Sequence, residues 1–155
     1  MSSLRTDDAE QPRIIALLRQ ASELGQATLF SRLEEVIGVS ELRQGHFGLL
    51  RFPGPDGLRP TELARRLGTS KQAINPLLND LERWGYIERR QDPADRRGRV
   101  LRLTDRGVEL LATIRRLHAE IEAEWEQALG PRRYTTLRSA LRELTSSHPD
   151  NVRDR

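Results

Sequence analysis

The chain has 155 residues, 36% of them hydrophobic and 32% charged, with a net charge of +3. This length suits one domain, and the composition is polar for a self-sufficient globule without being that of a disordered chain. The absence of cysteine excludes disulfides, thiolate metal ligands and cysteine nucleophiles. The longest apolar run, residues 14–18, is too short to span a membrane, and acids occupy positions 7 and 8, where a signal peptide is apolar. We therefore expect a cytoplasmic protein without membrane contacts.

The basic residues are concentrated in the middle of the chain. Residues 59–106 hold twelve basic and seven acidic side chains, a net charge of +5, whereas the remainder has a net charge of −2. All basic residues except Lys71 are arginine, the side chain that binds phosphate and guanine edges through paired hydrogen bonds. Nucleic acid is therefore the first partner to test.

Helical periodicity opens the chain. Apolar residues recur at three- and four-residue steps over residues 12–37, which predicts one long amphipathic helix or two in close succession. Residues 42–52 predict a shorter helical segment, closed by a loop of proline and glycine at residues 53–57.

Two short helices joined by a four-residue turn come next. Pro60 suits a first helical turn, and Gly68 suits the left-handed residue that ends a helix. A small residue at Ala64, a glycine at Gly68 and an apolar residue at Ile74 have the spacing of a helix-turn-helix.

The second of these helices has an apolar face and a polar face. Either Thr69 or Ser70 is placed to cap it. The residues expected to be buried are Ile74, Leu77, Leu78 and Leu81. The opposite face offers Lys71, Gln72, Asn75 and Asn79 to base edges, which Gln and Asn can read, and Ser70 is placed to touch phosphate. Pro76 either kinks this helix or begins a new one capped by Asn75.

A period of two over residues 86–90 and 100–103 predicts a β-hairpin, with residues 92–99 as its charged turn. Arg96, Arg97 and Arg99 are candidates to enter a minor groove, where arginine is favoured. We expect Asp95 to form an ion pair with Arg97 or a neighbour that fixes the turn. The alternative is a disordered charged loop.

From residue 104 the helical period returns. Its expected seam is Leu111, Ile114, His118, Ile121, Trp125 and Ala128. A last helix, beginning at Pro131, carries Tyr134 and Leu137 in the same rhythm. This is more apolar surface than a small domain covers alone, which predicts a homodimer. The alternative is packing against the N-terminal helix of the same chain.

The segment from residue 63 to residue 107 resembles the MarR family of transcription regulators. The resemblance is carried by Glu62-Leu63-Ala64, by residues 81–87 (LERWGYI) and by Asp95-x-Arg97 followed by Leu103-Thr104. It implies a homodimer with interlocked first and last helices, and two recognition helices in successive major grooves of a pseudo-palindromic operator. It also implies relief by a small aromatic or anionic effector bound between the dimer helices and the winged-helix lobe.

The expected fold is mainly α with a small β-hairpin wing: a winged helix-turn-helix flanked by N- and C-terminal dimerisation helices. Residues 1–155 would form one domain, with the DNA-binding lobe at 58–104 and the dimerisation helices at 12–38 and 105–145. The expected function is that of a sequence-specific, double-stranded-DNA-binding transcription regulator, a repressor by preference. A winged helix for protein or RNA contacts is the alternative.

The resemblance implies an effector pocket near His46, Phe47, Leu50 and Arg51, where Arg51 could pair with an anion. The alternative makes Phe47 and Leu50 core and His46 a surface or cap residue. His118 is expected to be a buried, hydrogen-bonded dimer residue.

No catalytic motif supports an enzyme. The sequence has no nucleophile elbow, zinc helix motif, phosphate loop or cofactor fingerprint. Its three histidines, His46, His118 and His148, are scattered. We therefore expect neither catalytic residues, nor a cofactor, nor a metal site.

Overall fold

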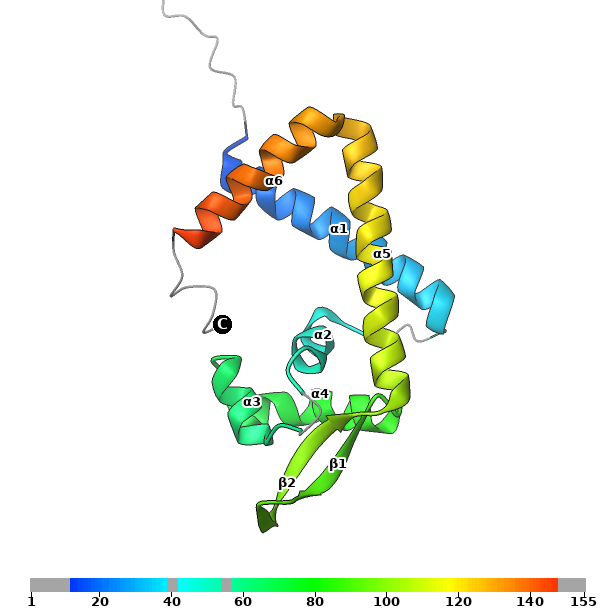
Figure 1. The fold of residues 1–155 in the computed structure, drawn as a ribbon, viewed down its shortest axis with the longest axis vertical. Coiled ribbons are helices and arrows are strands. Elements are labelled where there is room, and N and C mark those ends of the chain that lie inside the picture. Colours follow the sequence, from blue (N-terminus) through cyan, green and yellow to red (C-terminus); the bar gives the residue numbers. More distant parts are fainter. Residues whose placement is uncertain (1–11, 39–41, 54–56, 148–155) are drawn as a thin grey trace, which may run out of the picture.

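The protein is described by a computed structural model that covers residues 12–38, 42–53 and 57–147. Helices α1 and α6 lie at one end of the molecule, α3, α4 and a two-stranded hairpin lie at the other, and α5 runs between the two ends (Figure 1). The mainly α fold with a small hairpin is as predicted. The elements are α1 (Ile14–Ile37), α2 (Gln44–Leu50), α3 (Pro60–Arg66), α4 (Lys71–Arg83), β1 (Ile87–Asp92), β2 (Asp95–Leu103), α5 (Asp105–Leu129) and α6 (Pro131–Ser146).

Helix α1 is one uninterrupted helix rather than two. It ends at Gly38, whose φ of 68° is the left-handed conformation that closes helices. Leu29 and Leu33, four residues apart, are its buried residues. The N-terminal half of α1 is exposed, although it is equally apolar in sequence.

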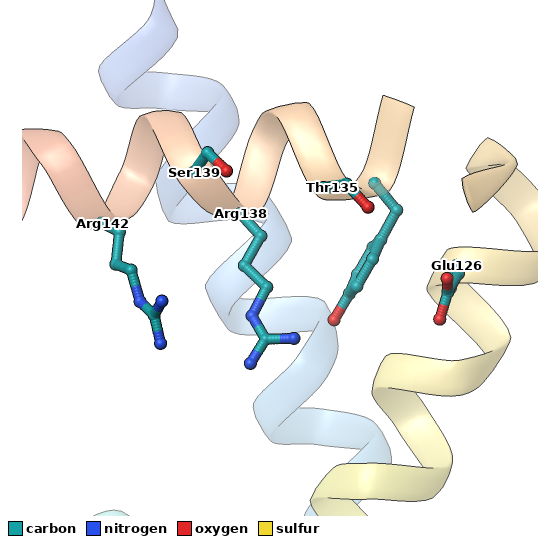
Figure 2. A pocket seen from close by; sticks show the side chains of 6 residues that line it. Glu126, Thr135, Arg138, Ser139 and Arg142 are labelled. Carbon is teal, nitrogen blue, oxygen red and sulfur yellow. The ribbon is translucent and has the colours of Figure 1, made fainter. Parts of the chain in front are cut away.

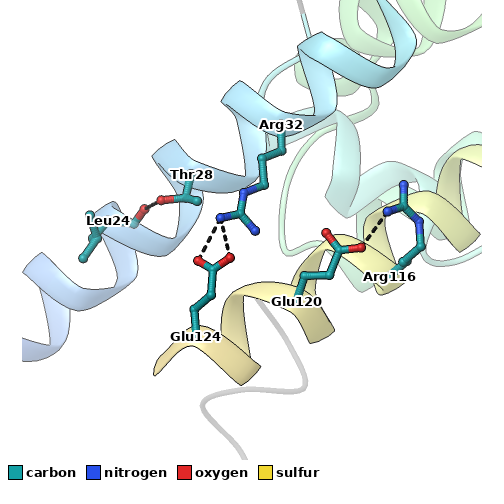
Figure 3. Close-up of polar contacts among 6 residues, drawn as sticks. All are labelled: Leu24, Thr28, Arg32, Arg116, Glu120 and Glu124. Atoms are coloured by element: carbon teal, nitrogen blue, oxygen red, sulfur yellow. Dashed lines mark hydrogen bonds and ion pairs between the residues drawn. The ribbon is translucent and has the colours of Figure 1, made fainter. Parts of the chain in front are cut away.

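Helices α1 and α5 cross within the same chain. At the crossing, a Cβ atom on Gly25 would lie 3.1 Å from the Trp125 ring, so glycine allows the close approach. The Arg32 guanidinium donates to both carboxylate oxygens of Glu124 at 2.7 and 2.8 Å (Figure 3). Helix α5 therefore packs against the N-terminal helix of its own chain, which is the second of the two arrangements predicted from the sequence.

The buried seam of α5 differs from the predicted one. Its buried residues are Gly107, Leu110, Ile114, Leu117 and Ile121. Of the predicted seam, Ile114 and Ile121 are buried, and Leu111 and Trp125 are half-buried and pack against the core. Ala128 and His118 are exposed in the single chain. His118 is exposed because the face packed against α1 and the lobe is centred on Leu110 and Leu117, and the prediction that His118 is a dimer residue stays a prediction. Apolar residues at steps of three and four indicate a helix, but they do not show which of two neighbouring apolar rows on its surface is the buried one.

The helix-turn-helix is formed as the spacing predicted. Leu63, Ala64 and Ile74 are 0%, 4% and 4% exposed where α3 and α4 meet. Gly68 turns the chain with a φ of 61°. The amide of Thr69 donates to the Ala64 carbonyl at 3.0 Å, which closes α3.

The hairpin is antiparallel, with Ile87 opposite Leu103 and Gln91 opposite Arg99. The expected turn over residues 92–99 was too long, because β2 begins at Asp95 and the register shifts between Gln91 and Asp92. The Asp92 Oδ1 atom accepts from the Ala94 amide at 2.8 Å, which tightens the turn.

Strict inside-outside alternation fails at the base of the hairpin. Tyr86 and Ile87 are both buried, as are Val100 and Leu101. The cause is that α3, α4 and α5 all contact the hairpin, and that Leu58 pairs with Leu101 through two backbone hydrogen bonds.

The hairpin is joined to α5 by a tight junction. Thr104 Oγ1 accepts from the Gly107 amide at 3.1 Å and donates to the Gly85 carbonyl at 2.5 Å. A Cβ atom on Gly107 would lie 2.1 Å from the Tyr86 carbonyl oxygen, so only glycine fits. The junction fixes where the hairpin lies relative to α5.

Among the described residues, the helices are all too short or too polar to cross a membrane.

Candidate nucleic-acid interface

The N-terminus of α4 is capped by Ser70. Its side-chain oxygen accepts from the Ala73 amide at 3.1 Å, which decides between the two candidate caps in favour of Ser70 over Thr69. The cap satisfies one of the four amides that a helix start leaves unpaired.

Helix α4 continues through Pro76 from Lys71 to Arg83. The fresh start with Asn75 as its cap is therefore wrong. Pro76 is exposed and lacks the amide that would bond the Gln72 carbonyl, so it costs one helical hydrogen bond. The polar residues of α4 consequently share one helix axis, with the relative positions that the sequence predicted.

The two faces of α4 are separated as expected. Ile74, Leu78 and Leu81 are buried, and Leu77 is half-buried rather than buried. On the other side, Ser70, Lys71, Gln72 and Asn79 are exposed, and Asn75 is half-buried. The predicted reading face is therefore present as a surface.

The positive charge of α3 is partly offset. Glu62 accepts from Arg65 at 2.8 and 2.9 Å and from Arg66 at 2.9 Å. These arginine hydrogen bonds lower the pKa of Glu62 to about 2. Arg65 and Arg66 are thus weaker candidates for phosphate binding than their number in the sequence suggests.

Arg89 of β1 ties the hairpin to α4, a role that the sequence did not reveal. Its guanidinium donates to the carboxylate of Glu82 and, at 2.8 Å, to Oδ1 of Asn79. Glu82 and Asn79 are three residues apart on the helix, so one arginine reaches both. The only signal in the sequence was an arginine in a strand that follows an acidic helix end.

Arg59, just before α3, anchors the hairpin turn. Its Nε and Nη2 atoms both lie 2.6 Å from Oδ2 of Asp92, and Nη2 lies 3.5 Å from Asp95. The pKa of Asp92 is lowered by the Ala94 amide first and by Arg59 second. Arg59 is one partner of Asp95, because the loop before α3 approaches the turn. The predicted pairing of Asp95 with Arg97 lies outside the described side chains. Sequence spacing did not reveal the contact between Arg59 and Asp92, which lie 33 residues apart.

The predicted wing arginines lie at the start of β2 rather than in an open turn. Arg99 is exposed, opposite Gln91. The side chains of Arg96 and Arg97 lie outside the described residues.

His46 is buried, and of the two predicted alternatives, a surface residue or a cap residue, it is the cap. Its Nδ1 atom accepts from the Arg43 amide at 2.9 Å at the start of α2, and its side chain is 2% exposed. Nε2 lies 3.6 Å from a carboxylate oxygen of Asp80 on α4. Burial is the main cause of a lowered His46 pKa. Because Nδ1 accepts a hydrogen bond, the ring proton is on Nε2.

The four predicted effector residues have different surroundings in the single chain. His46 borders a hollow of about 280 Å³ with Asp80 and Trp84. Phe47 stacks on Phe30 with ring centroids 5.1 Å apart. Leu50 is fully buried core, and Arg51 is exposed. The expectation that Phe47 and Leu50 serve packing agrees with these positions.

A separate hollow of about 350 Å³ lies along α6, bordered by Glu126 of α5. Arg138 and Arg142 extend from α6 to the same side of it (Figure 2). His148 lies outside the described residues. In the described ranges, no group of three or more His, Asp or Glu side chains is placed to hold a metal ion.

Known proteins share this arrangement. Residues 46–98 match a family model described as MarR family. A putative transcriptional regulatory protein for the hcr operon of Thauera aromatica is 30% identical over 135 residues, which is 84% of this chain and 81% of that protein. The chain belongs to the MarR family. The predicted resemblance is thereby confirmed.

Solved structures extend the match over the whole MarR fold. The transcriptional repressor CouR, bound to a 23-mer DNA duplex, is 26% identical with a TM-score of 0.67, covering 93% of this chain and 99% of that one. The reduced form of MarR from E. coli is 20% identical with a TM-score of 0.72, covering 87% and 98%, and it supports the fold alone. The chain is a winged-helix, DNA-binding transcriptional regulator of the MarR family.

Proposed function

We propose that the protein is a homodimeric repressor that binds a pseudo-palindromic operator and is released by a small effector. The observation that carries the proposal is the exposed polar face of α4, capped by Ser70 and tied to the hairpin by Arg89. The match to a repressor bound to duplex DNA supports the same class of target.

In this proposal α4 enters the major groove. Lys71, Gln72 and Asn75 lie in its first turns, the part of a recognition helix that contacts base edges. Lys71, Gln72 and Asn75 read base edges there. Ser70 caps the helix next to the phosphate backbone.

The hairpin serves as the wing. Arg96, Arg97 and Arg99 reach the adjacent minor groove, whose negative potential favours arginine. Residues 58–104 form the DNA-binding lobe within a single domain of residues 1–155, and residues 12–38 and 105–145 form the dimerisation helices.

The homodimer is supported by apolar side chains left uncovered in the single chain. On α1, Ile14 is 73% exposed, Ile15 81% and Leu24 60%. Helix α6 has no buried residue, and its Leu137 is 43% exposed. Clusters of exposed apolar residues are typical of protein interfaces.

Effector release follows from the family. An aromatic or anionic ligand is the expected class, and benzoate is a suitable probe. It should release the protein from its preferred duplex at millimolar concentration; a duplex affinity unchanged by benzoate and by a panel of aromatic carboxylates would remove this part of the proposal.

Selection from a randomised duplex library, at near-physiological salt, tests the proposal. The expected result is an enriched inverted repeat with half-site centres about 10–10.5 base pairs apart. Retention of duplexes without any shared sequence would contradict it and would favour a winged helix used for protein or RNA contacts.

A further inference from the structure

The contact between Arg89 and Asn79 restricts what one residue of the reading face can recognise. A guanidinium has five donors and no acceptor. The side-chain atom of Asn79 that faces Arg89 must therefore be its carbonyl oxygen, Oδ1, and the distance of 2.8 Å is that of a hydrogen bond. The side-chain NH2 group of Asn79 is then the part that faces away from Arg89 and is available to a partner.

The Arg89 contact is held in place from its other side. The same guanidinium donates to the Glu82 carboxylate, and the Arg89 side chain is 26% exposed. Glu82 and Asn79 lie on α4 while Arg89 lies on β1, so rotating the Asn79 amide would break a contact between the helix and the hairpin. Gln72 and Asn75 differ: among the described residues they have no side-chain hydrogen-bond partner.

We infer that Asn79 presents its side-chain N–H group to DNA, and that Arg89 is the positioning residue that holds the Asn79 Oδ1 atom toward the hairpin. The inference rests on the proposed function. Adenine presents an N7 acceptor beside an N6 donor, and reading it through two bonds requires both amide atoms. The Arg89 hydrogen bond takes one of the two lone pairs of Asn79 Oδ1 and holds this oxygen toward the hairpin. Asn79 therefore favours a partner with acceptors alone: a guanine edge or a phosphate oxygen.

Gln72 and Asn75 keep both amide atoms and remain able to read adenine. The three amide side chains of α4 are therefore not equivalent, although the sequence gives them the same chemistry. The hairpin contributes to base selection through α4, without touching the major groove itself.

Duplex selection with wild type and three variants tests this inference. Asn79→Ala removes the donor edge. Arg89→Met, made together with Glu82→Gln, removes the guanidinium without leaving an unpaired carboxylate, and Glu82→Gln alone is its matched control. Circular dichroism melting confirms that each variant is folded at the selection temperature.

The expected results separate the two possible partners of Asn79. If it donates to guanine, Asn79→Ala abolishes a guanine preference at one position of each half-site. If it donates to phosphate, Asn79→Ala weakens every duplex equally. In the guanine case Arg89→Met/Glu82→Gln also raises the frequency of adenine at that position by about fivefold or more, because Oδ1 is released, and the control does not. In the phosphate case Asn79 reads no base, so the double variant keeps the wild-type base preferences.

Three results would overturn the inference. They are an adenine preference in the wild type that Asn79→Ala removes, an Asn79→Ala variant indistinguishable from wild type, and, where Asn79→Ala removes a guanine preference, an Arg89→Met/Glu82→Gln variant that keeps this preference unchanged. An absence of any enriched sequence with wild type would instead overturn the proposed function, and the inference with it.

Discussion

At the scale of single residues, the sharpest constraint on the fold is Gly107. Its position next to the Tyr86 carbonyl leaves no room for a methyl group. We predict that Gly107→Ala lowers the free energy of unfolding by about 1–3 kcal/mol, the usual cost of overpacking. Urea denaturation followed by circular dichroism measures it.

Gly48 provides the matched control for Gly107. It lies inside α2, and a Cβ atom there would meet Leu67 at 3.8 Å, an ordinary contact. Gly48→Ala should therefore raise the free energy of unfolding by about 0.5–1 kcal/mol. Equal effects of the two substitutions would show that crowding at Tyr86 is not the cause.

Residue-scale interpretation from sequence succeeded where local geometry decides and failed where distant contacts decide. Gly68 and the Ser70 cap follow from helix-end rules that involve only neighbouring residues. The burial of His46 and the pairing of Arg59 with Asp92 depend on segments 34 and 33 residues away in sequence, Asp80 and the hairpin turn. Nothing in residue spacing encodes such contacts.

At the scale of elements, the cap of α4 makes a clear prediction. Ser70→Ala removes the acceptor for the Ala73 amide and should destabilise the protein by about 1 kcal/mol. Thr69→Ala should change stability much less, because Thr69 does not cap the helix. Thermal unfolding of both variants checks this prediction. A larger loss of stability with Thr69→Ala than with Ser70→Ala would show that Thr69, not Ser70, caps the helix.

The hairpin turn should respond to acid through Asp92. The pKa of Asp92 is lowered in the folded state by the Ala94 amide and Arg59. The stabilisation is therefore complete above the ordinary pKa of 3.8 and is lost as pH falls through the lower, folded value. We predict that Asp92→Asn reduces the loss of stability between about pH 5 and pH 3, measured by urea denaturation.

A matching variant tests the partner of Asp92. Arg59→Gln should also flatten the pH dependence, but less than Asp92→Asn, because the Ala94 amide remains. A pH dependence identical to wild type in both variants would mean that the turn is not held by this carboxylate.

Like single residues, element boundaries were predicted well where the local sequence decides them and poorly where contacts between distant segments decide them. The order of helices and strands followed from periodicity, and the start of α4 was predicted to within one residue because Thr69 and Ser70 are both capping residues. The start of β2 was placed too late, since charged residues 95–99 look like a turn in sequence. Their extended conformation comes from pairing with β1, which is a contact between segments and not a local preference.

At the scale of the whole molecule, the exposed apolar side chains predict a dimer in solution. Leu24→Glu combined with Leu137→Glu places charges on the α1 and α6 surfaces and should shift the protein to monomer in sedimentation equilibrium. Val108→Glu is the control, since Val108 is 55% exposed but lies near the hairpin end of α5. A monomeric wild type, or equal dissociation by Val108→Glu, would contradict this assignment of the interface.

The central claim is that α4 reads DNA sequence, and an affinity comparison tests it most directly. Wild type and Gln72→Ala/Asn75→Ala are titrated, at near-physiological salt, with the selected duplex and with a shuffled duplex of the same composition. We predict that wild type prefers the selected duplex by about 1,000-fold or more, and that the double variant loses most of this preference while keeping its weak affinity for shuffled DNA. An equal preference for the selected duplex in wild type and in the double variant would show that these α4 side chains do not read the DNA sequence.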